Sequence, residues 1–431
     1  MSTTLHPTAG YILNVGASAE PTPADARSRA LLRALASQVA AIAALPEQAE
    51  KRWLWYRHNR LEPVRPMLLV FPEDSWAEVL PADTLELENP FWRQQEWYLK
   101  HLLYRHEALC DDFVIEPNLC VTKLFRGTGW GMYPGYRSPG GAKGAWAYDP
   151  PIKSPDDISK LTYPSIEYDV AATERRADAL HETLGDLLAV QLCCPPWHAN
   201  LIGEACAFRG IDQFMLDMYD RPQWVHQLMD FLAEGVWRQI KSLEDAGDLT
   251  LNNGHHYNDS GGIGYSDELP APDFDGKHVR LKDLWGFGVA QEAVGIGPAQ
   301  HEEFLLNYQL RMLNHYGLNA YGCCEPYHTK YKMLEKVPRL RRVSVSPWSD
   351  LAVSAEACRD RWILSWKPNP AMVVGRFDQD WIRQTIRGML EVTRGCVVEM
   401  VHKDTFTVND DRSRLETWAR IAREEIEHTL A

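Results

Sequence analysis

Cysteine, histidine and acidic side chains are concentrated in one short stretch, Gly322-Cys323-Cys324-Glu325-Pro326-Tyr327-His328. Thiolate, carboxylate and imidazole are zinc-binding groups, and a catalytic zinc ion takes three protein ligands and leaves one position open. Adjacent residues of a strand point to opposite faces, so only one of the two cysteines is expected to reach such a site. We predict that Cys324 faces the site and that Glu325, His328 and His402 are further metal ligands. Two buried free cysteines with a capping glutamate are the alternative.

Other histidines and acids are candidates for proton transfer. The adjacent His255 and His256 could bind a metal or act as acid or base near neutral pH, although a hydrogen-bonded loop histidine is equally consistent. Glu399 alternates inward with its valine neighbours, which predicts an apolar-lined carboxylate with a raised pKa. Glu292 could orient a substrate or simply be an acid at the entry to a helix. We predict that these four residues are catalytic.

Aromatic and basic side chains near the predicted strand ends are candidates for substrate binding. The chain holds 16 Trp and 17 Tyr, which favours a wide pocket with aromatic walls. The two lysines of the set could hold a substrate carboxylate, or they could be solvated. The predicted substrate-binding residues are Trp76, Trp197, Tyr257, Cys323, Trp348, Lys367 and Lys403.

The elements that must position these residues alternate between short β-prone runs and longer helical patterns. This alternation implies parallel strands joined by helical crossovers, and eight such units predict a closed (β/α)8 barrel, an α/β fold with its active site at the carboxyl ends of the strands. A doubly wound open sheet is the competitor, but a Gly-x-Gly-x-x-Gly fingerprint does not follow the first run. The eight runs are 67–71, 112–116, 187–193, 249–252, 319–322, 342–346, 362–366 and 396–401.

An N-terminal helical extension is expected over residues 1–62, before a barrel over 63–431. Thr22 and Pro23 resemble a helix cap and first turn, and leucines then recur at helical spacing. The connection 126–151 is rich in glycine and aromatic residues and is predicted to be a lid, with a surface loop on the barrel rim as the alternative. A second long connection, 254–286, is expected to cover the same end.

Composition narrows the class of protein. The chain has 431 residues and a formal net charge of −14, which argues against a nucleic-acid or anionic-membrane surface. The first thirty residues do not combine a basic start with an apolar run, so a secretory signal is not expected. Nine cysteines in so long a chain are typical of a reducing compartment. A cytoplasmic protein that does not bind a membrane is therefore expected.

From about residue 63 to the end, the chain resembles the uroporphyrinogen decarboxylase superfamily, which includes cobalamin-dependent methyltransferases and is distantly similar to cobalamin-independent methionine synthase. The resemblance is carried by five short segments. They are Arg221-Pro222 before a long helix that ends at Asp245-Ala246-Gly247, Ile296-Gly297-Pro298 leading to Phe304, Gly322-Cys323-Cys324-Glu325, Ser344-Val345-Ser346-Pro347-Trp348, and Ser365-Trp366-Lys367-Pro368-Asn369-Pro370.

The resemblance implies one barrel and allows two kinds of activity. Decarboxylase members hold a tetrapyrrole with an Arg-Gln-x-Gly-Arg segment, whereas this chain has Arg57-His58-Asn59-Arg60, which makes a tetrapyrrole substrate improbable. Methyltransferase members bind zinc through a His-x-Cys pair and a later cysteine. In this chain Cys324 matches the pair's cysteine and Gly322 replaces its histidine, while Cys396, Glu399 or His402 stands for the third ligand.

The leading hypothesis is a methyltransferase that moves a methyl group between a small methylated compound and a corrinoid on a partner protein, or a thiol, with zinc held by Cys324. If zinc is not used, His255, His256 or Glu399 would protonate the leaving group. A metal-free decarboxylase or lyase is the second hypothesis, with Lys367, Lys403 and Arg126 as inward basic residues. A non-catalytic corrinoid- or tetrapyrrole-binding module is the third. The chain could also form a homodimer.

Overall fold

The computed structural model describes residues 19–137, 147–195, 197–257 and 259–430, and its chain begins with two helices. These are α1 (Ala26–Ala43) and α2 (Pro46–Asn59). The first helix starts later than the Thr22 cap predicts, because the Asp25 side chain caps it by accepting a hydrogen bond from the Ser28 amide at 2.7 Å. Leucines on one face of α1 are buried against α4 and α5, which form a second hydrophobic core with the β2 and β7 region.

A parallel sheet of seven strands forms the centre of the protein, in the order β1-β13-β12-β11-β10-β9-β8. A separate parallel pair joins β2 (Asn118–Thr122) to β7 (Ala189–Cys193). The fold is therefore mixed α/β with parallel strands, as the alternation predicts. The strands of the large sheet are β1 (Met67–Val70), β8 (His198–Ala199), β9 (Trp285–Gly288), β10 (Leu318–Tyr321), β11 (Leu340–Val345), β12 (Ile363–Trp366) and β13 (Val398–His402).

Two of the predicted strands, 112–116 and 249–252, are irregular segments. Their side chains form hydrogen bonds with the backbone of neighbouring strands. The Asp112 carboxylate accepts from the Leu68 amide at 2.7 Å, and the Asp112 amide donates to the Leu68 carbonyl. The Asn252 amide group donates to the Trp285 carbonyl at 3.0 Å and accepts from its amide at 2.9 Å. Strand pairing within the described part of the chain therefore does not close the sheet. The Asp112 contacts lie at the unpaired edge of β1, and the Asn252 contacts lie at Trp285, the first residue of β9.

The sequence did not predict β9, because two of its four residues are glycines, which have low strand propensity. The glycines are needed for close packing. A Cβ atom at Gly288 would lie 2.5 Å from a ring carbon of Tyr321 on the neighbouring strand β10, so a side chain cannot be placed there.

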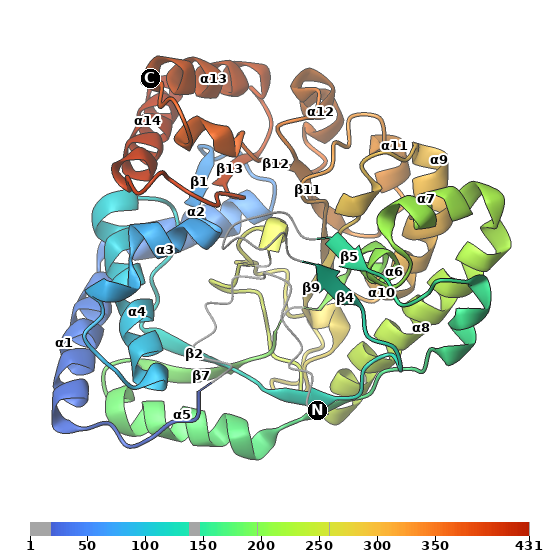
Figure 1. Cartoon of the computed structure of the whole chain (residues 1–431). Coiled ribbons are helices and arrows are strands. Elements are labelled where there is room, and N and C mark those ends of the chain that lie inside the picture. The colour runs from blue at the N-terminus through green and yellow to red at the C-terminus, as the bar shows by residue number, and fades with distance from the viewer. Residues whose placement is uncertain (1–18, 138–146, 196, 258, 431) are drawn as a thin grey trace.

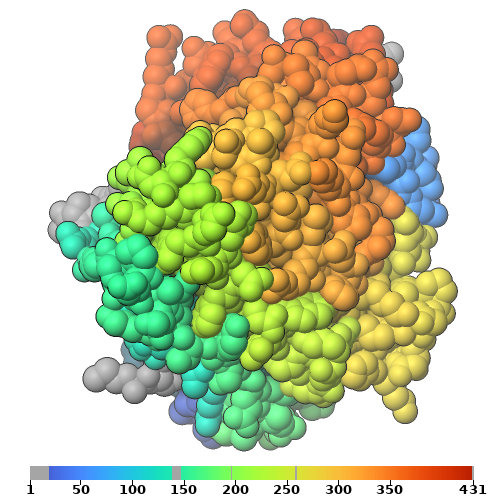
Figure 2. All heavy atoms as spheres, turned by 90° about the vertical axis from the view of Figure 1, so that its right-hand side faces the viewer, coloured from blue at the N-terminus to red at the C-terminus, as the bar shows by residue number. Residues whose placement is uncertain are grey.

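The longer helices lie around the outside of the strands (Figure 1). Residues 211–246 form two helices that are divided at Arg221-Pro222, where proline starts the second helix. Figure 2 shows a face on which the middle of the chain, coloured green to orange, forms one continuous surface. The helices are α3 (Trp76–Val79), α4 (Pro90–Tyr104), α5 (Val170–Leu184), α6 (Leu201–Arg209), α7 (Ile211–Asp220), α8 (Pro222–Ala246), α9 (Pro298–His301), α10 (Asn307–Leu313), α11 (Tyr331–Leu334), α12 (Leu351–Cys358), α13 (Gln379–Val392) and α14 (Ser413–Leu430).

The glycine- and aromatic-rich connection packs on helices. It contains the hairpin β4 (Gly135–Arg137) and β5 (Ala147–Asp149), and β3 (Phe125–Gly127) pairs with β6 (Ile166–Tyr168). The Trp130 ring lies 6.2 Å from the rings of both Phe208 on α6 and Phe231 on α8. Residues 138–146 of this connection lie outside the described part of the chain. That the connection forms a lid therefore remains a prediction.

Residues 254–257 and 259–266, together called here the interior loop, lie against the strands and do not only cover the strand ends. Tyr257 stacks on Phe71, which directly follows β1, with ring centroids 3.8 Å apart. The short turn Asp259–Gly261 contacts β10 and β11, and Ser260 is fully buried. The loop thus carries polar residues into the interior, where they meet side chains from several strands.

In the described residues we find no single helix that is both long enough and apolar enough to cross a membrane; α1 and α2 pass that test only as a pair, bent by 60°.

Candidate functional site

Cys323 and Cys324 lie together just beyond the end of β10. The chain turns at Gly322, where φ is +98° and a Cβ atom would lie 2.5 Å from the Tyr327 ring. Because the strand has already ended at Tyr321, the alternation of strand side chains does not apply. The two sulfur atoms are 3.3 Å apart. The expectation that the two cysteines point to opposite faces is therefore wrong.

A buried lysine and a hydroxyl group donate to one of these sulfurs. The Cys323 Sγ lies 3.3 Å from the Lys403 Nζ and 3.1 Å from the Ser260 Oγ, and the lysine also donates to Ser260 at 2.8 Å. Cys323 and Lys403 are 5% and 3% exposed, so solvent screens this pair little. An adjacent ammonium group favours the thiolate form of a cysteine, which is the nucleophilic form.

The second sulfur lies on the open side of the same site. The Cys324 thiol donates to the Asp404 carboxylate at 3.3 Å, and both residues are partly exposed. Its hydrogen bond with Cys323 and its burial raise the pKa of Cys324, so it remains a thiol at neutral pH. Lys403 also lies 3.3 Å from Asp404. We call the five residues Cys323, Cys324, Lys403, Asp404 and Ser260 the thiol site.

Beneath the thiol site, charged side chains from β11, from β13 and from the residue that follows β12 are buried. The Arg342 Nε lies 3.1 Å from the Glu399 Oε1, and the Ser365 hydroxyl also donates to this oxygen. Burial alone would raise the pKa of Glu399, but the charges of Arg342, His58 and Lys367 outweigh burial and lower it. The prediction of a raised pKa for Glu399 is therefore wrong. Burial lowers the pKa of Lys367 to about 8.

The predicted metal ligands around Cys324 do not converge on it. The Glu325 carboxylate is buried and accepts from the amides of Ala290 and Cys323 and from the Tyr327 hydroxyl. The His328 Nδ1 accepts from the Asp350 amide at 3.3 Å. The His402 Nδ1 lies 3.2 Å from the Thr405 hydroxyl, and its ring lies edge-on to Trp418 at 4.5 Å.

Glu292 lies near a second partly buried acid that the sequence did not indicate. Burial raises the pKa of Glu292, and burial together with the charge of Glu292 raises the pKa of Glu204, on α6, to about 7. Two carboxylates that share one low-dielectric region disfavour each other's ionised form. Because Glu204 lies inside a helix and not at a strand end, position along the chain gave no signal for it.

The predicted aromatic residues lie in different surroundings. Trp197 lines a cavity together with His198, His256, Trp285, Phe287 and Tyr316. Trp76 is buried in the core against Trp97, His101 and Tyr104. Trp348 is 66% exposed.

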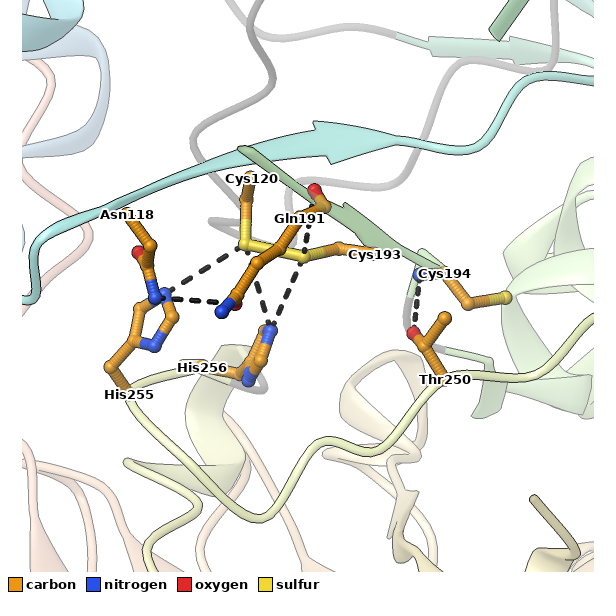
Figure 3. The surroundings of a disulfide bond; sticks show 8 residues. All are labelled: Asn118, Cys120, Gln191, Cys193, Cys194, Thr250, His255 and His256. Atoms are coloured by element: carbon orange, nitrogen blue, oxygen red, sulfur yellow. Dashed lines mark hydrogen bonds between the residues drawn. A yellow bond between two sulfur atoms is a disulfide. The ribbon is translucent and has the colours of Figure 1, made fainter. Parts of the chain in front are cut away.

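Cysteines from β2 and β7 meet the two adjacent histidines of the interior loop (Figure 3). Cys120 and Cys193 form a disulfide. The Nε2 atoms of both imidazoles point toward the sulfurs, and Cys120, His255 and His256 could hold a metal ion. We call these four residues the Cys–His cluster. Sequence reasoning missed Cys120, because it lies in the middle of a strand and not at a strand end.

Both histidines of the Cys–His cluster are neutral at physiological pH. Burial lowers the pKa of His255 to about 4, and burial together with the proximity of His255 lowers that of His256 to about 3. A neutral imidazole has a free lone pair on one nitrogen, which is the form that binds a metal ion.

Solved structures that resemble this chain include a methyltransferase. It is a methyltransferase from Methanosarcina mazei, with 11% sequence identity and a TM-score of 0.48 over 88% of this chain and 99% of that chain. No family model matches this chain, and no curated protein matches it. A likeness at this identity and TM-score says nothing about activity, so the function must be argued from the residues.

Proposed function

We propose that this protein is a methyl-transfer enzyme of the uroporphyrinogen decarboxylase superfamily, and that its reacting group is the thiolate of Cys323. The observation that carries the proposal is the buried contact between the Cys323 Sγ and the Lys403 Nζ at 3.3 Å. A methyl carbon is attacked in line by a soft nucleophile, and a thiolate next to a fixed cation is such a nucleophile.

The Cys323 thiolate takes the methyl group directly from its donor. The Cys323 sulfur forms a bond to the methyl carbon, the bond between that carbon and the donor's heteroatom breaks, and the heteroatom keeps the electron pair and takes a proton from solvent. Lys403 and Ser260 stabilise the thiolate before attack. The methyl group then passes to an acceptor, and the sulfur regains its electron pair. We propose that the acceptor is a thiol or a reduced corrinoid carried by a partner protein.

The thiol site itself does not fit a zinc ion. The Lys403 ammonium group lies 3.3 Å from both the Cys323 sulfur and the Asp404 carboxylate, so a metal ion bound to these two groups would lie beside a positive charge. Glu325 uses both carboxylate oxygens in other hydrogen bonds. In this proposal the ammonium group therefore supplies the positive charge that zinc supplies in the resembled methyltransferases.

The proposal also includes a barrel architecture. The segment that begins at Asp112 lies beside β1, and the segment 249–252 lies between β7 and β9, where the Thr250 hydroxyl accepts from the Cys194 amide at 2.6 Å. These contacts support a closed ring of strands in which the Asp112 and 249–252 segments are irregular members. In a (β/α)8 barrel, residues just after the strands form the active site, as Cys323 and Lys403 do here.

Free methylcobalamin provides a direct test. Reduced full-length protein is incubated with methylcobalamin, the visible spectrum is followed, and the Cys323 peptide is analysed by mass spectrometry. We expect loss of methylcobalamin and a methyl group on Cys323. Cys323→Ser should show neither, whereas Cys358→Ser, which changes a buried free cysteine on α12, should behave as the wild type. A spectral shift without methylation would instead indicate a corrinoid-binding protein.

The decarboxylase hypothesis has less support from the described residues. Arg126 has a 73% exposed side chain and pairs with Asp169. Lys367 is buried, and its ammonium group donates to Ser365 and to the Ser260 carbonyl, which leaves it committed to protein groups. A substrate carboxylate would have to displace these contacts. Release of CO2 without any methyl transfer would favour this hypothesis over ours.

A further inference from the structure

Three sulfur–nitrogen distances in the Cys–His cluster are close to those of a tetrahedral metal site. Cys120 Sγ lies 3.8 Å from the Nε2 atoms of both His255 and His256, and Cys193 Sγ lies 3.5 Å from that of His256. Zinc bonds of about 2.3 Å to sulfur and about 2.0–2.1 Å to nitrogen, at a tetrahedral angle, place sulfur and nitrogen ligands about 3.5–3.6 Å apart. The three sulfur–nitrogen distances are close to this value.

We propose that Cys120 and Cys193, when reduced, bind a zinc ion together with His255 and His256, and that the disulfide is the metal-free state of the same site. The two states exclude each other, because a sulfur that is bonded to another sulfur is not a thiolate ligand. Two thiolates and two imidazoles are a ligand set that suits zinc, and four protein ligands leave no open position. The site is therefore structural.

The interconversion is a thiol–disulfide exchange. A dithiol reductant supplies two electrons and two protons, so the bond between Cys120 and Cys193 breaks, two thiols form, and the reductant becomes a disulfide. Zinc then displaces one proton from each thiol, while the two neutral imidazoles bind without losing a proton.

The Cys–His cluster joins the interior loop to the β2–β7 pair. His255 and His256 come from this loop, whereas Cys120 and Cys193 belong to the β2–β7 pair. Four residues after His256, the same loop places Ser260 against Cys323 and Lys403. A zinc ion would tie the start of the loop to the strands and thereby restrain Ser260 at the thiol site.

Metal binding can be measured without any methyl-transfer assay. Full-length protein, purified without chelator, is prepared in the disulfide form and after reduction with a phosphine, and each form is dialysed against zinc or cobalt(II). We expect one metal ion per reduced chain, with the intense cobalt spectrum of tetrahedral thiolate coordination, and no metal above background in the disulfide form. Hydrogen exchange of the interior loop, residues 254–257 and 259–266, should be slower in the zinc-bound protein.

Variants show whether the bound metal depends on the residues of the Cys–His cluster or on another cysteine. Cys120→Ser and His256→Asn should lose the metal, while Cys194→Ser should keep it, because the Cys194 side chain points away from the cluster (Figure 3). The proposal is overturned if reduced wild-type protein binds no zinc, if the disulfide form binds as much, or if Cys194→Ser loses the metal as Cys120→Ser does. The comparison of the reduced and disulfide forms uses only wild-type protein, so misfolding of a variant cannot affect its result.

Discussion

Glu399→Gln tests how the buried charges beneath the thiol site are held. Gln has nearly the same size as Glu and can still accept a hydrogen bond from Ser365, but it removes the negative charge that faces Arg342 and Lys367. Arg342 is 1% exposed and Lys367 is 2% exposed. Breaking a buried ion pair by removing one partner costs about 3–5 kcal/mol, because the remaining charge is left uncompensated.

We therefore expect Glu399→Gln to lower the free energy of unfolding by about 3–5 kcal/mol, measured by urea denaturation at pH 6. The loss should be smaller at pH 8. Glu399 raises the pKa of Lys367, so without it that pKa falls below about 8, and Lys367 in the folded variant becomes neutral at lower pH. A lysine whose folded-state pKa is lowered makes stability rise with pH, since the unfolded state binds more protons.

A double variant and a surface control complete this test. Arg342→Met combined with Glu399→Gln should cost less than the sum of the single changes, because neither partner is then left unpaired. Glu356→Gln removes an exposed ion pair with Arg359 and should leave the unfolding midpoint unchanged. A Glu399→Gln protein within about 1 kcal/mol of the wild type would show that Arg342 and Lys367 are solvated or already neutral and do not depend on Glu399.

Three further predictions concern single groups. Lys403→Met should slow alkylation of Cys323 by iodoacetamide about tenfold, measured by peptide mass spectrometry, because the thiolate loses its cation; an unchanged rate would contradict the proposed activation. Burial, followed by the charge of Lys330, lowers the pKa of His301 to about 3, so unfolded chains bind an extra proton below pH 6.5. Between pH 7 and pH 5.5, the wild type should lose about 1 kcal/mol more unfolding free energy than His301→Gln, and equal losses would refute a neutral His301. Glu204→Gln should stabilise the protein by about 1–2 kcal/mol at pH 8 and by much less at pH 5, because the pKa of about 7 means that the folded wild type resists ionisation. A thermal melt that shows no gain at pH 8 would count against this.

The sequence predicted the class of fold because the pattern of apolar residues is a local property. Six of the eight predicted runs contain a strand, and parallel pairing follows from the helices between them. The two failures, 112–116 and 249–252, have strand-like composition, but Asp112 and Asn252 replace ladder hydrogen bonds with side-chain bonds. A side chain that substitutes for the backbone cannot be recognised from residue type alone.

The sequence by itself determined which reactive residues of the site come just after strands. Cys323, Cys324 and Lys403 are such residues. Only the tertiary structure decided which of them meet. Cys120 joins His255 and His256 across 135 and 136 residues of chain, and the sign of the Glu399 pKa shift depends on Arg342, which lies on another strand. Strand position follows from local patterning, whereas contact, charge and metal geometry depend on distances between segments that only the folded chain brings together.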